Sequence, residues 1–142
     1  MPISCQGRII KAVGIDLVEI AKIEGLIERY DRETLTLVFA AEELEASRLE
    51  ANQLEANRLA PKAEEYLALC FASKEAIGKA LATGLAEINW FDIVAKLDSS
   101  GRLSVNLLGS ARQKADELGL QQWEMSWVSW QHHLFVRAIA YQ

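Results

Sequence analysis

The sequence AEEYLALCFASKEAIGKALATGL, residues 63–85, predicts a helix around which the rest of the chain is organised. Its apolar residues recur every three or four positions, which is the spacing of one helix face. These residues are Tyr66, Leu67, Cys70, Phe71, Ile77 and Leu81. Pro61 precedes the stretch, where a proline costs a helix little, and Gly84 follows, where a left-handed residue can end a helix.

Glu75 and Lys79 lie near the centre of this helix, four residues apart. That spacing puts a carboxylate and an ammonium group on one helix face, where both can contact one ligand. A solvated ion pair is the more common role of such a pair. The functional interpretation depends on whether another part of the chain brings further polar groups to the same place.

Composition and charge bound the class of protein. A chain of 142 residues predicts a single domain, residues 1–142, and hydrophobic residues make up 51% of it. The net charge is -5, which argues against a nucleic-acid surface, because phosphate binding usually needs a basic excess. No apolar run is long enough to span a membrane. Cys5 and Cys70 have no metal-ligand spacing, and we interpret them as reduced thiols of a cytoplasmic protein.

The segment from Arg8 to Val18 predicts a strand that carries an acidic residue near its end. Its apolar residues at odd positions, Ile9, Val13, Ile15 and Leu17, share one face. Asp16 points from the opposite face, either as a helix cap or as a ligand. Gly14 allows another backbone or a ligand to come close to the strand.

Three further helical segments are expected before residue 60. Val18 to Tyr30 predicts a helix in which Lys22 and Arg29 lie off the apolar stripe, one heptad apart. The segment 31–39 predicts a short helix or turn. The segment 41–59 is rich in Ala, Glu and Leu, so it is helical by propensity, and we interpret it as a partly exposed insertion.

The second half of the chain predicts two hairpins separated by a helix. Strands are expected at 90–97 and 103–107, a helix at 109–118 with Ser110 as its cap, and strands at 123–130 and 134–141. The connecting turn of the last hairpin contains His132 and His133, which point apart on an extended chain and make a poor metal site. Together with the helices, these strands predict an α+β fold around an antiparallel sheet.

Two stretches, taken together, resemble the signatures of a known family. The segment GIDLVEIAKIE, residues 14–24, looks like the N-terminal signature of the holo-acyl-carrier-protein synthases, the small 4'-phosphopantetheinyl transferases. The segment FASKEAIGKA, residues 71–80, followed by Thr83 and Gly84, resembles their second signature. The order of the two stretches and the hairpin that begins at Trp90 also agree with that family.

The resemblance implies transfer of phosphopantetheine from coenzyme A to a serine of an acyl carrier protein, releasing adenosine 3',5'-bisphosphate. Asp16 and Glu75 match the ligand positions of a Mg²⁺ cofactor, and Lys79 matches the residue beside the diphosphate. The resemblance also implies coenzyme A contacts from Lys74, Thr83 and Gly84. Either Glu75 or a water held by the metal ion would accept the serine proton.

The family also implies two protein partners. Carrier proteins are acidic, and the basic residues Lys22 and Arg29 match the family positions that contact them. The family forms homotrimers, and the tryptophan-rich last hairpin is a candidate for the subunit boundary. The sequence leaves open whether the carrier protein serves fatty-acid or polyketide synthesis.

Three departures from the family pattern favour an alternative function. Cys70 stands where the family often has arginine, and Gln131 aligns with a frequent histidine. The segment from Ala46 to Arg58 is also longer than usual. The alternative is a non-catalytic descendant that binds a carrier protein or a nucleotide.

Overall fold

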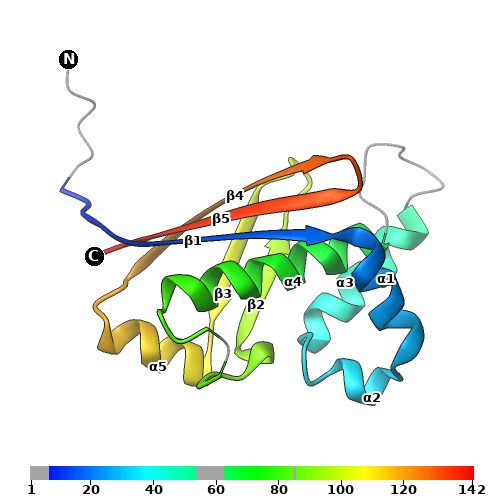
Figure 1. Cartoon of the computed structure of the whole chain (residues 1–142), viewed down its shortest axis with the longest axis horizontal. Coiled ribbons are helices and arrows are strands. Elements are labelled where there is room, and N and C mark those ends of the chain that lie inside the picture. Colours follow the sequence, from blue (N-terminus) through cyan, green and yellow to red (C-terminus); the bar gives the residue numbers. More distant parts are fainter. Residues whose placement is uncertain (1–6, 54–62, 85) are drawn as a thin grey trace.

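The computed structural model describes residues 7–53, 63–84 and 86–142, and its centre is one long helix between two antiparallel sheets (Figure 1). The larger sheet contains β1 (Ile10–Glu19), β4 (Gln122–Trp130) and β5 (His133–Tyr141), in the order β1-β5-β4. The smaller sheet is the hairpin of β2 (Ile93–Leu97) and β3 (Leu103–Leu107). The predicted α+β class with antiparallel sheets is confirmed.

The helices follow the predicted order. They are α1 (Ile20–Arg29), α2 (Arg32–Leu35), α3 (Ala41–Gln53), α4 (Ala63–Ala80) and α5 (Gly109–Glu117), and a 3-10 turn, η1 (Trp90–Asp92), precedes β2. The expected strand at 90–97 therefore begins three residues late. Pro61, Leu85 and the later part of the expected helix at 41–59 lie outside the described residues.

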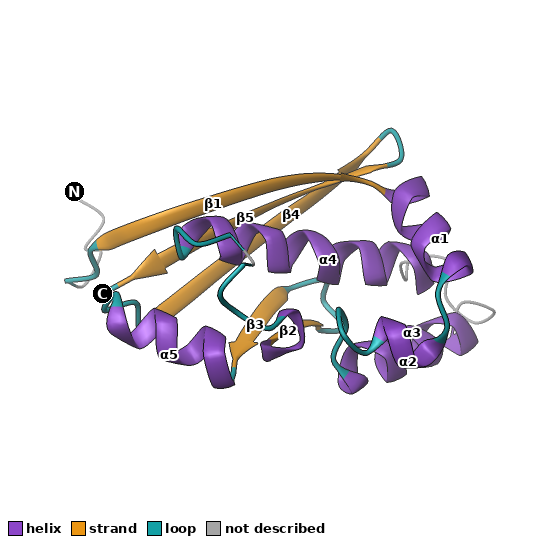
Figure 2. Ribbon diagram, turned by 60° about the horizontal axis from the view of Figure 1, so that its bottom comes forward, coloured by secondary structure: helices purple, strands orange, loops and turns teal. Residues whose placement is uncertain are grey.

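The helix α4 confirms the prediction made from residues 63–85, although it ends at Ala80. It crosses one face of the larger sheet, and β2, β3 and α3 lie on its other side (Figure 2). Most of its residues are buried, because it packs against β1, β5, α3 and β2 at once. The main hydrophobic core therefore surrounds α4. No helix in the described parts of the chain is long and apolar enough to cross a membrane.

The strand β1 turns even-numbered residues toward α4 and exposes the apolar residues at odd positions. Gly14 and Val18 are buried, whereas Val13, Ile15 and Leu17 are 49%, 45% and 64% exposed. A strand with one apolar face usually buries that face. Here the apolar face lies on the outside of the larger sheet, beside Phe135 of β5.

The sequence predicts Ser110 as the cap of α5, and this prediction is wrong. A distant residue caps the helix instead. Ser110 lies within the first turn, and its N–H and Oγ both donate to Asp92 Oδ2, at 2.8 and 2.6 Å. Asp92 belongs to η1, so this cap joins the start of α5 to the start of β2. Gly119 follows the helix with a φ of 72°, the left-handed conformation that commonly ends a helix.

The last hairpin closes with two residues, Gln131 and His132, whose φ values are 47° and 63°. Positive φ at both central residues is typical of the tight turns that match strand twist. His133 is therefore the first residue of β5 and not part of the turn. The carbonyl of His132 accepts a hydrogen bond from the Ile20 N–H at 2.9 Å, which joins this turn to the start of α1.

Candidate functional site

The two signature stretches meet where β1 passes the C-terminal part of α4, between Ala76 and Ala80. A Cβ on Gly14 would lie 1.8 Å from the carbonyl oxygen of Ala76 and 2.9 Å from the backbone nitrogen of Ala80. No side chain fits between strand and helix at this crossing. Glycine therefore allows the direct backbone approach that the sequence predicts, and it brings Asp16 to the helix residues Glu75 and Lys79.

Lys79 bonds directly to the end of β1. Its Nζ donates to Asp16 Oδ1 at 3.1 Å and to the carbonyl of Ile15 at 2.9 Å. The Asp16 side chain is 14% exposed and that of Lys79 is 52% exposed. The carboxylate is therefore largely enclosed, while the ammonium group stays accessible to a ligand from solvent.

Glu75 completes a cluster of two carboxylates and one ammonium group. Burial raises the pKa of the Glu75 carboxyl above its ordinary value, the negative charge of Asp16 raises the pKa further, and Lys79 lowers it. Asp16 and Glu75 thus lie close enough to repel one another. A cation bound between them would remove that repulsion.

The composition of this cluster limits the metal that fits it. Within the described residues, no group of three or more His, Cys, Asp or Glu side chains is placed to hold a metal ion. Zinc would need such a set of nitrogen or sulfur ligands. Mg²⁺ is bound by one or two carboxylates and takes its other ligands from substrate phosphates and water. Asp16 and Glu75 fit that requirement.

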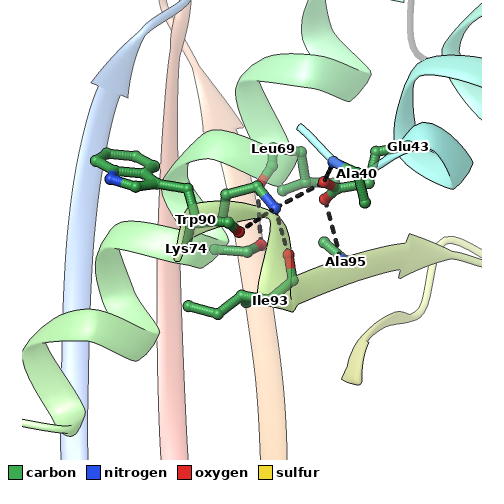
Figure 3. A network of polar contacts seen from close by, with 8 residues as sticks. Ala40, Glu43, Leu69, Lys74, Trp90, Ile93 and Ala95 are labelled. Carbon is green, nitrogen blue, oxygen red and sulfur yellow. Dashed lines mark hydrogen bonds and ion pairs between the residues drawn. The ribbon is translucent and has the colours of Figure 1, made fainter. Parts of the chain in front are cut away.

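Lys74 does not lie in this cluster. The expected contact between Lys74 and coenzyme A would need an accessible ammonium group, and the structure does not provide one. Its side chain is fully buried, and its Nζ lies 2.6 Å from Glu43 Oε1 (Figure 3). The same Nζ donates to the carbonyls of Trp90 and Ile93. Since its three donors are used within the core, Lys74 has no free surface for a nucleotide. The structure gives Lys74 an internal role instead.

Thr83 and Gly84 lie in the turn that follows α4, beyond Lys79. The Thr83 hydroxyl donates to the carbonyl of Gly84 at 3.0 Å, and Gly84 is exposed with a φ of 57°. The left-handed residue predicted at Gly84 is present, although the helix already ends at Ala80. Their contact with coenzyme A stays a prediction.

The basic residues Lys22 and Arg29 are exposed on α1, which begins four residues after Asp16. Both line a hollow of about 330 Å³ on this helix. Its other lining residues are Ala21, Gly25, Leu26 and Tyr30. The hollow therefore combines two cations with small and apolar side chains, close in sequence to the cluster.

Sequence reasoning missed Glu43. The only local signal is its position in the first turn of α3, from which Glu43 Oε1 accepts the Ala40 N–H at 2.8 Å as in a capping box. Of the three departures from the family pattern, Cys70 is a buried free thiol, Gln131 occupies the hairpin turn, and the segment from Ala46 to Arg58 lies partly outside the described residues. Burial and the charge of Glu43 raise the pKa of the Cys70 thiol well above its usual value, so Cys70 is an inert core residue.

Fold and cluster together define a class: an α+β protein with a partly buried acidic pair beside an accessible ammonium group, suited to a hard cation and a phosphate. A model of the 4'-phosphopantetheinyl transferase superfamily matches residues 12–134. The holo-acyl-carrier-protein synthase of Alkalilimnicola ehrlichii is 40% identical over 112 residues, which cover 78% of this chain and 80% of that one. The chain therefore belongs to the 4'-phosphopantetheinyl transferase superfamily, and the predicted family is confirmed.

Solved structures agree on the fold. The holo-acyl-carrier-protein synthase of Neisseria meningitidis matches with a TM-score of 0.76 at 22% identity, covering 93% of this chain and 98% of that one. The Helicobacter pylori enzyme, solved in complex with coenzyme A, matches with a TM-score of 0.66 at 22% identity, covering 90% and 98%.

Proposed function

We propose that this protein is a holo-acyl-carrier-protein synthase, which transfers 4'-phosphopantetheine from coenzyme A to a serine hydroxyl of an acyl carrier protein. The observation that carries the proposal is the convergence of Asp16, Glu75 and Lys79 from two separate signature stretches. The 40% identity to a relative named for this activity supports it. The leaving product is adenosine 3',5'-bisphosphate.

Asp16 and Glu75 are the proposed holders of Mg²⁺, which would offset the negative charge of the diphosphate. Lys79 places a point charge next to the same phosphates and favours departure of the leaving group. Because Lys79 is half exposed and bonded to Asp16, it can turn to a phosphate without leaving the cluster.

Glu75 is also the proposed acceptor of the serine proton. Glu75 lies in the same cluster as Lys79, and a carboxylate has two oxygens, so one can face Mg²⁺ while the other faces the serine hydroxyl. Thr83 and Gly84 are proposed to approach coenzyme A from the turn after α4, where their backbone is exposed or half-buried. Residues 1–142 are proposed to act as a single domain in the cytoplasm.

The direct test is intact-mass analysis of an apo acyl carrier protein incubated with this protein, coenzyme A and Mg²⁺. We expect a gain of about 340 Da, the mass of one phosphopantetheine group, that is lost when the metal is chelated. No gain with several carrier proteins and a folded sample would refute the proposal and favour the non-catalytic alternative. A gain that survives chelation would refute the proposed role of Mg²⁺.

The hollow on α1 is the proposed docking site of the acidic carrier protein, and Lys22→Glu tests it. We expect the KM for the carrier protein to rise about tenfold, with the KM for coenzyme A unchanged, because the new charge repels only the acidic partner. Steady-state kinetics with each substrate varied in turn measure both constants. Lys96→Glu on β2 makes the same charge change at another exposed position and is the control. Equal rises in both KM values would show that Lys22 is not a carrier contact.

The outer face of the larger sheet is the proposed trimer interface. Its exposed apolar residues are Val13, Ile15, Leu17, Val128, Trp130 and Phe135. Several of them line a hollow of about 360 Å³. A contiguous exposed patch of this kind is typical of an association surface.

Trp130→Glu is expected to convert the trimer to monomers. The indole of Trp130 is 70% exposed in the single chain and would be covered by a second copy in the trimer. A glutamate at this position would place a charge in the interface, and burial of an unpaired charge is unfavourable. Light scattering coupled to size exclusion measures the mass in solution. Leu37→Glu, at a 63% exposed position on another part of the surface, is expected to leave the mass unchanged. A wild-type protein that is monomeric at micromolar concentration would refute the interface.

A further inference from the structure

A fully buried ion pair joins α4 to α3. Lys74 Nζ lies 2.6 Å from Glu43 Oε1, and neither side chain has any exposed surface. Lys74 Nζ also donates to the carbonyl of Trp90 at 3.1 Å and to the carbonyl of Ile93. An ammonium group has three donors, so the three acceptors around Lys74 satisfy it completely.

The Glu43 carboxylate is equally well satisfied. Its Oε1 also accepts the Ala40 N–H at 2.8 Å, and its Oε2 accepts the Ala95 N–H at 3.1 Å. No buried polar side-chain atom in the described part of the chain lacks a partner. The network therefore joins three regions far apart in sequence: the start of α3, α4 at Lys74, and the consecutive elements η1 and β2 (Figure 3).

A buried ion pair of this kind contributes little net stability compared with apolar side chains at the same positions. Replacing both members of a buried ion pair by apolar residues is often neutral or stabilising, because burial of two charges offsets their attraction. Apolar packing, however, is not directional. Hydrogen bonds to four backbone groups and between two side chains fix α4 in one rotation and one axial position relative to β2.

The position of the Lys74–Glu43 pair along α4 affects where Glu75 of the functional cluster is placed. Lys74, Glu75 and Ala76 are consecutive, and successive residues of a helix point about 100° apart. Lys74 fixes the helix to β2, and Ala76 contacts Gly14 of β1 through its backbone. Glu75 lies between these two points of attachment. Its placement against Asp16 depends on both.

We propose that Lys74 and Glu43 are positioning residues of the Asp16–Glu75–Lys79 cluster, an inference that rests on the transferase function proposed above. The Gly14 contact sets how closely α4 approaches β1, and the Lys74–Glu43 pair sets how the helix is turned there. Misplacing a ligand side chain through loss of its supporting contacts typically costs ten- to a hundredfold in metal affinity or activity.

The test compares Lys74→Met with the double variant Lys74→Met/Glu43→Gln. The single variant leaves a buried carboxylate without its cation and is at risk of misfolding, whereas the double variant leaves no buried charge. Leu120→Ala removes a buried core side chain beside α5 and is the control for lost stability. Each folded variant is titrated with Mn²⁺ in the presence of coenzyme A, and kcat and KM for transfer are measured.

We expect the double variant to bind Mn²⁺ about tenfold or more weakly and to lose about a hundredfold in kcat, with the carrier-protein KM within threefold of wild type. Leu120→Ala is expected to keep both the Mn²⁺ affinity and kcat within threefold. A folded double variant with wild-type Mn²⁺ affinity and kcat would overturn the positioning role, and equal losses in Leu120→Ala would do the same.

The two proposals fail in different ways. A wild-type protein that binds Mn²⁺ with coenzyme A but transfers nothing refutes the transferase, while the Mn²⁺ affinities of the variants still decide the positioning role. Wild-type protein that binds no Mn²⁺ with coenzyme A refutes both the proposed metal ligands and their positioning. If the wild-type protein transfers phosphopantetheine and the double variant is equally active, the positioning role is refuted and the transferase function stands.

Discussion

Gly14→Ala is expected to destabilise the protein by about 3 kcal/mol or more and to abolish transfer. The added Cβ would lie 1.8 Å from the Ala76 carbonyl oxygen and 2.9 Å from the Ala80 backbone nitrogen. Both atoms belong to the backbone of a buried helix, so no side-chain rotation can relieve the clash. Either β1 or α4 must move as a unit, and the movement separates Asp16 from Glu75 and Lys79.

The matched control is Gly25→Ala on α1, where an added Cβ would have nothing within 4 Å. Alanine is favoured over glycine in a helix by about 0.5–1 kcal/mol, so this variant is expected to be more stable than wild type. Urea denaturation of both variants measures the two free energies of unfolding. Gly14→Ala within 1 kcal/mol of wild type would contradict the direct contact of strand and helix.

Glu75→Gln is expected to lower kcat by a factor on the order of 100 to 10,000 while leaving the protein folded. Glutamine keeps the volume of glutamate but loses the charge that would hold Mg²⁺ and accept a proton. Rates of phosphopantetheine transfer to an apo carrier protein measure the effect. Near-normal turnover would exclude Glu75 from the site.

In metal-free buffer, the same variant is expected to equal or exceed wild type in thermal stability at neutral pH, as measured by thermal denaturation. The pKa of Glu75 is raised in the folded state, by burial first and by Asp16 second, so its ionised form is disfavoured on folding. Stability from this group is present at low pH and is lost as the pH rises through the folded pKa. A neutral side chain avoids that loss. Glu117→Gln, exposed at the end of α5, is the control and should change neither rate nor stability.

Local spacing predicts the central helix and the shared face of Glu75 and Lys79, whereas the meeting of Asp16 with these residues follows from the resemblance of the two stretches to the family signatures. Glu75 and Lys79 share a helix face, and Gly14 beside Asp16 signals a close approach of backbones. The same patterns could not place Lys74, because lysine is almost always exposed and its burial requires a partner from another element. That partner, Glu43, lies 31 positions earlier in the sequence.

Two other features also depend on distant segments. The apolar odd-numbered residues of β1 lie outside, because the opposite face is turned to α4, which approaches so closely at Gly14 that a Cβ does not fit there. The cap of α5 comes from Asp92, 18 residues before Ser110, and no local rule predicts it. The elements are thus predictable from the sequence, whereas these particular contacts between them are not.

The order of strands in the larger sheet has a consequence for how the chain is made. The strand β5 lies between β1 and β4, so β1 has no sheet partner until residues 133–141 have been synthesised. The strand that carries Asp16 therefore stays without a sheet partner while residues 20–132 are synthesised. Pairing of segments so far apart in sequence is slow. We expect the protein to complete its functional cluster only late in synthesis, and its apolar β1 to be the segment most in need of a chaperone until then.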